Sequence, residues 1–164
     1  MSRLPEVQAK VDAFFARVSA RHGDDMQCAT GCSDCCHVRL SVTQVEADAI
    51  RAELATWTDE RRAELAANAA AAAPDRCTAL DATGRCLIYA ARPITCRSHG
   101  APIRMRPEGA RALPVVQSCF RNFTHTTPAP DCVIDQETLS TLTLAVDRAA
   151  GHRGERVDLA ALFV

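Results

Sequence analysis

The stretch Cys28-Ala-Thr-Gly-Cys32-Ser-Asp-Cys35-Cys36 places four of the nine cysteines of the 164-residue chain within nine residues. If this stretch is helical, residues three and four apart lie on one face, so all four thiols fall within about a third of the helix circumference. Thiolates grouped in this way usually bind soft or borderline metals such as zinc, iron and copper(I). The stretch therefore predicts a cysteine-rich metal site.

Two details indicate that these four cysteines do not form a complete metal site by themselves. Gly31 costs about 1 kcal/mol relative to alanine inside a helix, so we expect Cys28 in a loop that leads into a helix starting near Cys32. Cys35 and Cys36 are adjacent and would diverge by about 100° on that helix, so one metal is not expected to bind all four thiolates. Further ligands are then expected from later in the chain, where the candidates are Cys77, Cys86, Cys96 and Cys119. The sequence thus predicts a two-part centre that holds either two metals or an iron-sulfur cluster.

The composition favours a cytoplasmic protein with reduced thiols. The net charge is −1 and the sequence pI is about 6.5, which excludes a broad electrostatic surface for nucleic acid or for an anionic membrane. Charged residues interrupt the N-terminal segment where a secretory signal needs an apolar region, and no apolar run approaches the roughly 18 residues of a membrane span. In the cytoplasm, clustered cysteines are typical of metal ligands or redox groups rather than of disulfides.

Hydrophobic periodicity and capping residues predict a mainly α protein. We expect helices over residues 4–20, over 43–56 with the capping-box pattern Thr43-Gln-Val-Glu46, and from 58 or 59 to 73. A short helix is expected after Pro93, and a last long helix from Gln136 to about 150, capped by Asp135 and ended by Gly151. A final turn after residue 158 completes the helical prediction.

Short strands are expected between the helices. Residues 77–80 and 86–89 flank a turn containing Gly84 and predict a β-hairpin, which would bring Cys77 and Cys86 close together. A further short strand is expected within 113–119. The length of the chain suits one domain. The predicted fold is a small single domain over residues 1–164, with about four to five helices and a short β-hairpin around a polycysteine metal site.

The order of the cysteines resembles that of a bacterial cysteine-cluster family of zinc- or iron-chelating proteins, the YkgJ type. The resemblance rests on Cys28-x3-Cys32-x2-Cys35-Cys36, on Arg76-Cys77-Thr-Ala-Leu80, and on Gly84-Arg-Cys86-Leu-Ile-Tyr89-x2-Arg92-Pro93-x2-Cys96-Arg97. It covers roughly residues 28–120, and the joint pattern is far more specific than a single CxxC. Carried over by position, it implies the ligand set Cys28, Cys32, Cys35, Cys36, Cys77, Cys86, Cys96 and Cys119.

Several side chains remain outside this ligand set. Cys132 has no counterpart in the family pattern and is expected to be a lone thiol. His37 and His99 lie near cysteines and are expected to be surface residues or groups that support the ligands, with direct ligation as the alternative. Arg97 is expected either to donate hydrogen bonds to thiolates, to bind an anion, or to act structurally. Tyr89 is expected to be a packed anchor, and Trp57 a core anchor.

The first functional hypothesis is a protein whose partners are metal ions, with a structural, storage or delivery role for zinc or iron. The alternative is an iron-sulfur protein that acts in electron transfer or in a modification reaction, and a copper(I) thiolate protein is a third candidate. A thioredoxin-type dithiol is disfavoured because Cys32-x2-Cys35 does not open a helix after a strand. The sequence contains no Gly-rich phosphate loop, no Gly-x-Ser-x-Gly and no HExxH motif.

Overall fold

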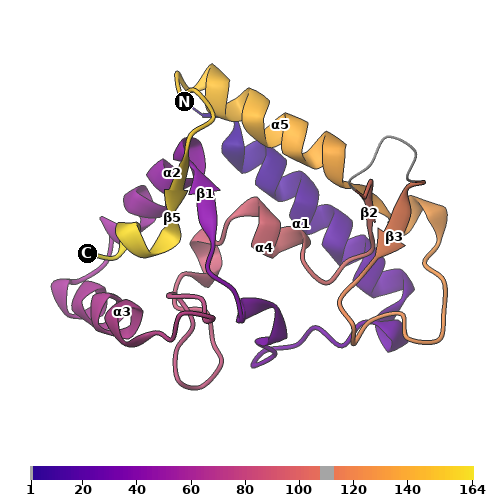
Figure 1. Ribbon diagram of the computed structural model, residues 1–164, viewed down its shortest axis with the longest axis horizontal. Coiled ribbons are helices and arrows are strands. Elements are labelled where there is room, and N and C mark those ends of the chain that lie inside the picture. The colour runs from indigo at the N-terminus through magenta and orange to yellow at the C-terminus, as the bar shows by residue number, and fades with distance from the viewer. Residues whose placement is uncertain (1, 108–112) are drawn as a thin grey trace. The chain divides into compact units, whose positions relative to one another are not determined.

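The computed structural model describes residues 2–107 and 113–164. Within them lie five α-helices and five short strands, so the fold is mainly α as predicted (Figure 1). The helices are α1 (Leu4–Arg21), α2 (Gln44–Leu54), α3 (Asp59–Ala71), α4 (Ile94–Ser98) and α5 (Gln136–Ala149). The strands are β1 (Ser41–Thr43), β2 (Ile103–Met105), β3 (Val115–Gln117), β4 (Ile134–Asp135) and β5 (Arg156–Asp158).

The chain forms two compact units. The first unit contains residues 1–4, 29–93 and 146–164, and the second contains residues 5–28 and 94–145. Each unit is therefore assembled from segments that are distant in sequence, and each is described below by itself.

Local capping signals start both long helices of the first unit. In α2, the backbone N–H of Thr43 donates to Glu46 Oε2 at 3.0 Å, which completes the predicted capping box. In α3, the hydroxyl of Thr58 accepts a hydrogen bond from the backbone N–H of Arg61 at 3.3 Å. These contacts satisfy N–H groups that have no partner inside the helix, and they confirm both predicted starts.

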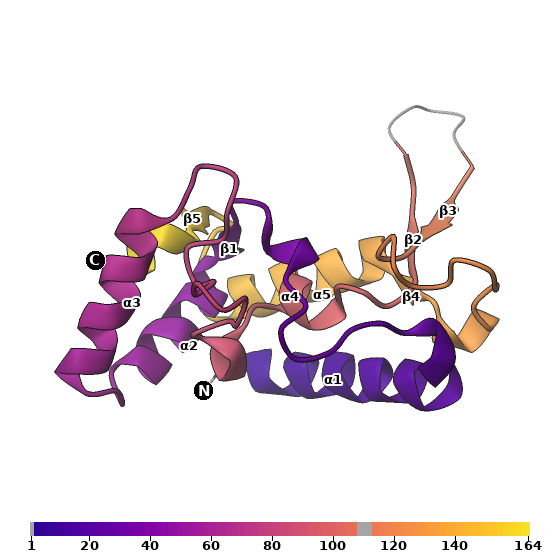
Figure 2. The ribbon, with the colours of Figure 1, turned by 90° about the horizontal axis from the view of Figure 1, so that it is seen from below.

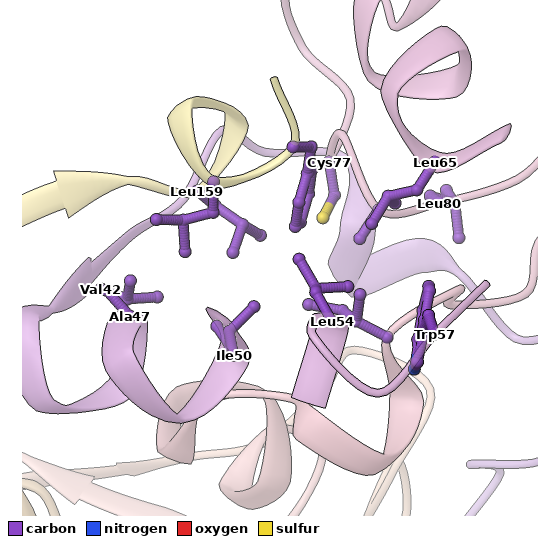
Figure 3. Close-up of a cluster of buried hydrophobic side chains, with 13 residues drawn as sticks. Val42, Ala47, Ile50, Leu54, Trp57, Leu65, Cys77, Leu80 and Leu159 are labelled. Atoms are coloured by element: carbon purple, nitrogen blue, oxygen red, sulfur yellow. The ribbon is translucent and has the colours of Figure 1, made fainter. Parts of the chain in front are cut away.

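The core of the first unit is an apolar cluster shared by α2, α3, the segment around Cys77 and the C-terminal turn. Trp57 is buried in it, as predicted, and its indole N–H donates to Glu53 Oε1 at 3.1 Å. Figure 3 shows the sulfur of Cys77 among these apolar side chains. Fully burying a Leu, Ile or Val side chain contributes about 1.5–3 kcal/mol. The buried members include Val42, Ile50, Leu54, Leu65, Leu80, Ile88 and Leu159.

A buried carboxylate links α5 to the start of α2. Asp147 is 0% exposed. Its Oδ1 accepts from the backbone N–H of Val45 at 2.9 Å, and its Oδ2 accepts from that of Gly154 at 3.0 Å. Close by, β1 and β5 pair antiparallel with Ser41 opposite Asp158. The C-terminal segment is thereby attached to α2 by backbone and side-chain hydrogen bonds.

The second unit combines α1 and α4 with a three-stranded sheet in the order β3-β2-β4. Strands β2 and β3 run antiparallel, side by side, with Ile103 opposite Gln117 (Figure 2). Strand β3 confirms the strand expected within 113–119. The predicted cap of α5 is also confirmed, because Asp135 Oδ1 accepts from the backbone N–H of Thr138 at 2.9 Å. Hydrogen bonds from Thr138, and then from Arg104, lower the pKa of Asp135 to about 2.

Two local predictions around the cysteines were wrong. The helix expected from Cys32 is only a single 3₁₀ turn over Asp34–Cys36. Gly, Cys, Ser and Asp all rank below the good helix formers, and Ser and Asp favour caps and turns, so this stretch has little intrinsic tendency to form a helix.

The predicted hairpin at 77–89 is a loop closed by one isolated antiparallel bridge between Leu80 and Cys86. The carbonyls of Thr78 and Leu80 accept from the Asn68 side chain of α3, at 2.9 and 3.1 Å. These acceptors are therefore satisfied by a side chain instead of by a neighbouring strand. Tyr89 was predicted as a packed anchor, but it is 63% exposed, with the Arg92 guanidinium 4.0 Å above its ring.

Candidate metal centre

The adjacent cysteines of the first unit lie close together. Cys35 Sγ and Cys36 Sγ are 4.0 Å apart. Two sulfurs that bind one tetrahedral zinc at about 2.3 Å lie about 3.8 Å from each other. The expected divergence of this pair was therefore wrong, because it assumed α-helical geometry where the chain forms a single 3₁₀ turn. The separation suits two thiolates on one metal.

The first cysteine cluster and the segment around Cys77 are joined through the backbone. The N–H of Cys77 donates to the carbonyl of Cys36 at 2.8 Å. The loop after Cys77 also approaches the cluster, since a Cβ on Gly84 would lie 3.2 Å from the carbonyl oxygen of Gly31. Gly84 has φ of 80°, a conformation that L side chains rarely adopt. Glycine at this position thus permits both the turn and the close approach.

The cysteines of the first unit range from buried to exposed. Cys77 is buried in the core, Cys36 and Cys86 pack partly buried against it, and Cys35 is exposed. Cys32 is partly buried, with its sulfur 4.0 Å from Asp34 Oδ2. Among residues 2–107 and 113–164, no three Cys, His, Asp or Glu side chains already converge to hold a metal ion. What fits a metal here is the donor chemistry and the 4.0 Å pair.

The thiols of this group raise one another's pKa. The pKa of Cys35 is raised by its hydrogen bond with Cys36, by burial and by the charge of Cys36. Burial raises the pKa of Cys77, with a smaller contribution from Cys35. Burial, then Cys77 and Cys35, raises the pKa of Cys86 to about 11. These shifts favour the protonated thiols, and a cation bound among them would favour the thiolates instead.

We expect the metal-free protein to lose stability as the pH rises from about 9 to about 11. The pKa of Cys86 is raised from 9.0 in a free thiol to about 11 in the folded chain. The folded state therefore keeps a proton that the unfolded state releases, so the stabilisation is complete below about pH 9 and disappears as the pH rises towards 11. Urea unfolding across this range, in reducing buffer with a chelator, measures the effect.

A Cys86→Ala variant is the control for this pH dependence, because it lacks the titrating thiol and its unfolding midpoint should change less with pH. Lys10 and Tyr89 are the only lysine and tyrosine of the chain, so the other side chains that titrate in this range are mainly the remaining cysteines, which both proteins share. A midpoint that stays constant or rises from about pH 9 to about pH 11 would contradict the expectation.

The second unit holds the other cysteines of the predicted ligand set. Cys96 lies in α4, and Gly100 follows the end of that helix. Cys28 Sγ lies 2.6 Å from the position that a Cβ on Gly100 would occupy. The side chain of Asn122 donates to Cys28 Sγ at 3.3 Å, and its backbone N–H donates to the carbonyl of Cys119 at 2.8 Å. These contacts hold the segments of Cys28, Cys96 and Cys119 together.

A family model with the printed description "CxxCxxCC: Putative zinc- or iron-chelating domain" matches residues 27–126. The chain belongs to this family. The matched range contains all eight cysteines of the predicted ligand set and excludes Cys132. No curated protein and no solved structure matches the chain. Among the described residues, none of the helices has both the length and the hydropathy needed to cross a membrane.

Relative to the CxxCxxCC pattern, this member has one extra residue between its first two cysteines. Three residues separate Cys28 from Cys32, where the pattern has two. The structure assigns these two cysteines to different units, Cys28 to the second and Cys32 to the first. The spacing and the contacts of Cys28 thus set it apart from the rest of the cluster.

Cys132, which lies outside the family match, is fully buried in the apolar core of the second unit with Val18 and Ala101. Arg97 forms an ion pair with Asp12 of α1 at 2.6 Å, which supports its structural role.

The two histidines near the cysteines differ in their surroundings. His37 is exposed. Burial lowers the pKa of His99, which favours the neutral imidazole that is able to bind a metal. The sequence analysis missed Asn122, because an asparagine three residues after a cysteine is not a recognisable ligand pattern.

Proposed function

We propose that this protein binds zinc or iron through two groups of cysteine thiolates. The group in the first unit comprises Cys32, Cys35, Cys36, Cys77 and Cys86, and the group in the second comprises Cys28, Cys96 and Cys119. The observation that carries the proposal is the 4.0 Å separation of Cys35 Sγ and Cys36 Sγ. That separation is close to what one tetrahedral metal requires of two sulfur ligands.

The primary site in this proposal is formed by the thiolates of Cys35, Cys36, Cys77 and Cys86. Cys36 Sγ contacts Cys35 Sγ, the backbone of Cys77 is hydrogen-bonded to that of Cys36, and Cys86 packs against the apolar cluster that contains Cys77. A cation among them would replace three raised-pKa protons by metal-sulfur bonds, so binding should release protons and stabilise this unit. Cys32, whose sulfur is 4.0 Å from Asp34 Oδ2, precedes the 3₁₀ turn and is the remaining cysteine of this unit.

The burial of the ligands supports a role in which metal is both held and exchanged. Cys77 belongs to the hydrophobic core, so a metal bound to it would tie the cysteine turn to that core. Cys35 is exposed, so an incoming ligand or acceptor protein can reach the same metal. We therefore favour a structural role combined with storage or delivery. Such a role requires reduced thiols, and the cytoplasm, where thiols stay reduced, is the location that we propose.

The competing proposal is an iron-sulfur protein, because cysteine thiolates that pack against an apolar core bind an iron-sulfur cluster as well as they bind zinc. Metal and acid-labile sulfide should be measured on protein purified anaerobically from cells supplied with both iron and zinc. Colourless protein with zinc or iron and no sulfide supports the first proposal. Brown protein with iron and sulfide contradicts the first proposal and supports the iron-sulfur protein. Copper as the main metal contradicts both of these proposals and supports a copper(I) thiolate protein. Protein without bound metal contradicts all three.

A further inference from the structure

Asn122 occupies an unusual position for a polar side chain in the second unit. It is 3% exposed and lies on the loop that follows Cys119. Its Oδ1 accepts from the backbone N–H of Gln27 at 2.8 Å, and its Nδ2 donates to the carbonyl of Gly100 at 2.8 Å. The same Nδ2 is 3.3 Å from Cys28 Sγ. One buried amide therefore contacts both segments that surround the Cys28 sulfur.

The backbone partners determine which end of the amide faces the sulfur. The N–H of Gln27 is able only to donate, and the carbonyl of Gly100 is able only to accept, so the oxygen and nitrogen of Asn122 cannot be interchanged. The group that meets Cys28 Sγ is the NH₂, and its second hydrogen points to an acceptor. A cysteine sulfur accepts hydrogen bonds more strongly as a thiolate than as a thiol, and the thiolate is the form that binds metals.

Gly100 also lies against the sulfur of Cys28. A Cβ at this position would lie 2.6 Å from Cys28 Sγ, and the φ of 97° also favours glycine. The sulfur thus lies beside both a hydrogen-bond donor and a backbone segment that carries no side chain. Such an arrangement restricts where Cys28 places its sulfur, although Cys28 itself lies in an exposed loop.

We propose that Asn122 is a positioning residue for Cys28 as a metal ligand, through an N–H to sulfur hydrogen bond. This inference rests on the proposed function, since it assigns a residue that orients one of the ligands. Groups that hydrogen-bond a metal ligand typically alter metal affinity by 10- to 100-fold. The hydrogen bond also withdraws charge from the ligand sulfur, which changes the electronic properties of the bound metal.

Cobalt(II) provides the test, because sulfur-to-cobalt charge-transfer absorption reports directly on thiolate ligands. The variant is Asn122→Ser, whose side chain stays polar but is one bond too short to place a donor where the amide nitrogen meets the sulfur. We expect it to lower cobalt affinity by about 10- to 100-fold and to shift the charge-transfer band. Cys28→Ser should weaken binding and reduce the absorption per ion. The double variant should resemble Cys28→Ser alone, because Asn122 acts through that sulfur.

The controls separate positioning from general stability. Urea unfolding of each metal-free variant measures any loss of fold, and an effect of Asn122→Ser that persists in the Cys28→Ser background would overturn the inference. So would an unchanged affinity and band in Asn122→Ser when the wild type binds cobalt. If the wild type binds no cobalt, zinc or iron, the proposed function fails, and the inference with it.

A measurement on the unaltered protein covers the case in which the variant does not fold. With cadmium-113 as the bound metal, NMR should show a scalar coupling between the metal and one side-chain amide proton of Asn122. Asn68 is the other asparagine of the chain, and its amide donates to two carbonyls, so no coupling is expected there. Loaded protein that shows no coupling at Asn122 would count against the hydrogen bond to a ligand sulfur.

Discussion

Cys35→Ala is expected to remove at least one equivalent of bound metal per chain and to lower the stability of the metal-loaded protein by about 3–4 kcal/mol. A ligand present at about 1,000 times its Kd stabilises the folded state by about 4 kcal/mol, and loss of one thiolate forfeits most of that contribution. Cys35 is exposed and lies 4.0 Å from Cys36 Sγ. In the metal-free protein, the same change at an exposed residue should shift stability by less than about 0.5 kcal/mol.

Cys132→Ala is the matched control, because it makes the same chemical change at a cysteine outside the ligand set. Cys132 is fully buried in the apolar core of the second unit, so the small cavity should cost about 1 kcal/mol with and without metal. Metal content should remain that of the wild type. Elemental analysis and urea unfolding of both forms measure these effects. If Cys35→Ala keeps full metal content, Cys35 is not a ligand.

Asp147→Ala is expected to destabilise the metal-free protein by about 2–5 kcal/mol. The carboxylate of Asp147 is 0% exposed and accepts from the backbone N–H groups of Val45 and Gly154. Removing it leaves the buried N–H of Val45 and the half-buried N–H of Gly154 without these acceptors, and an unsatisfied buried group costs about 1–3 kcal/mol. The start of α2 and the segment leading to β5 should lose their attachment together.

Two further variants serve as controls for this loss of stability, which is measured by urea unfolding. Asp147→Asn keeps one side-chain oxygen as an acceptor, so it should lose less stability than the alanine variant. Asp48→Ala removes a half-exposed carboxylate on α2, whose contacts are with Arg51 and His152, and should cost about 1 kcal/mol or less. Equal losses for Asp147→Ala and Asp48→Ala would show that the buried hydrogen bonds do not stabilise the unit.

Helix ends were predictable because the groups that make them are neighbours in sequence. Glu46 reaches back only three residues to Thr43, and Thr138 lies three residues after Asp135. Such contacts form whatever the rest of the chain does, so a pattern of residue types is enough to locate them. The same reasoning located α3, α4 and the final turn at Leu159–Leu162.

The geometry around the cysteines was less predictable because long-range partners compete with local tendencies. Helical spacing suggested that Cys35 and Cys36 diverge, whereas a single 3₁₀ turn places their sulfurs 4.0 Å apart. Strand patterning suggested a hairpin after Cys77, but Asn68 of α3 accounts for two of the carbonyls that a strand would have used. At Cys35 and Cys36 the low helix propensity of the neighbouring residues decided the outcome, whereas after Cys77 it depended on contacts that the local pattern does not contain.

The sequence alone determined the mainly α fold class, the family and the eight cysteines that the family pattern marks as ligand candidates, because residue types and their spacing carry that information. Only the tertiary structure decided that Cys28 and Cys32, four positions apart, belong to different compact units. It also decided that the sulfur of Cys28 meets Asn122, 94 residues further along the chain. Contacts across such a separation depend on how the whole unit packs, and no local pattern encodes them.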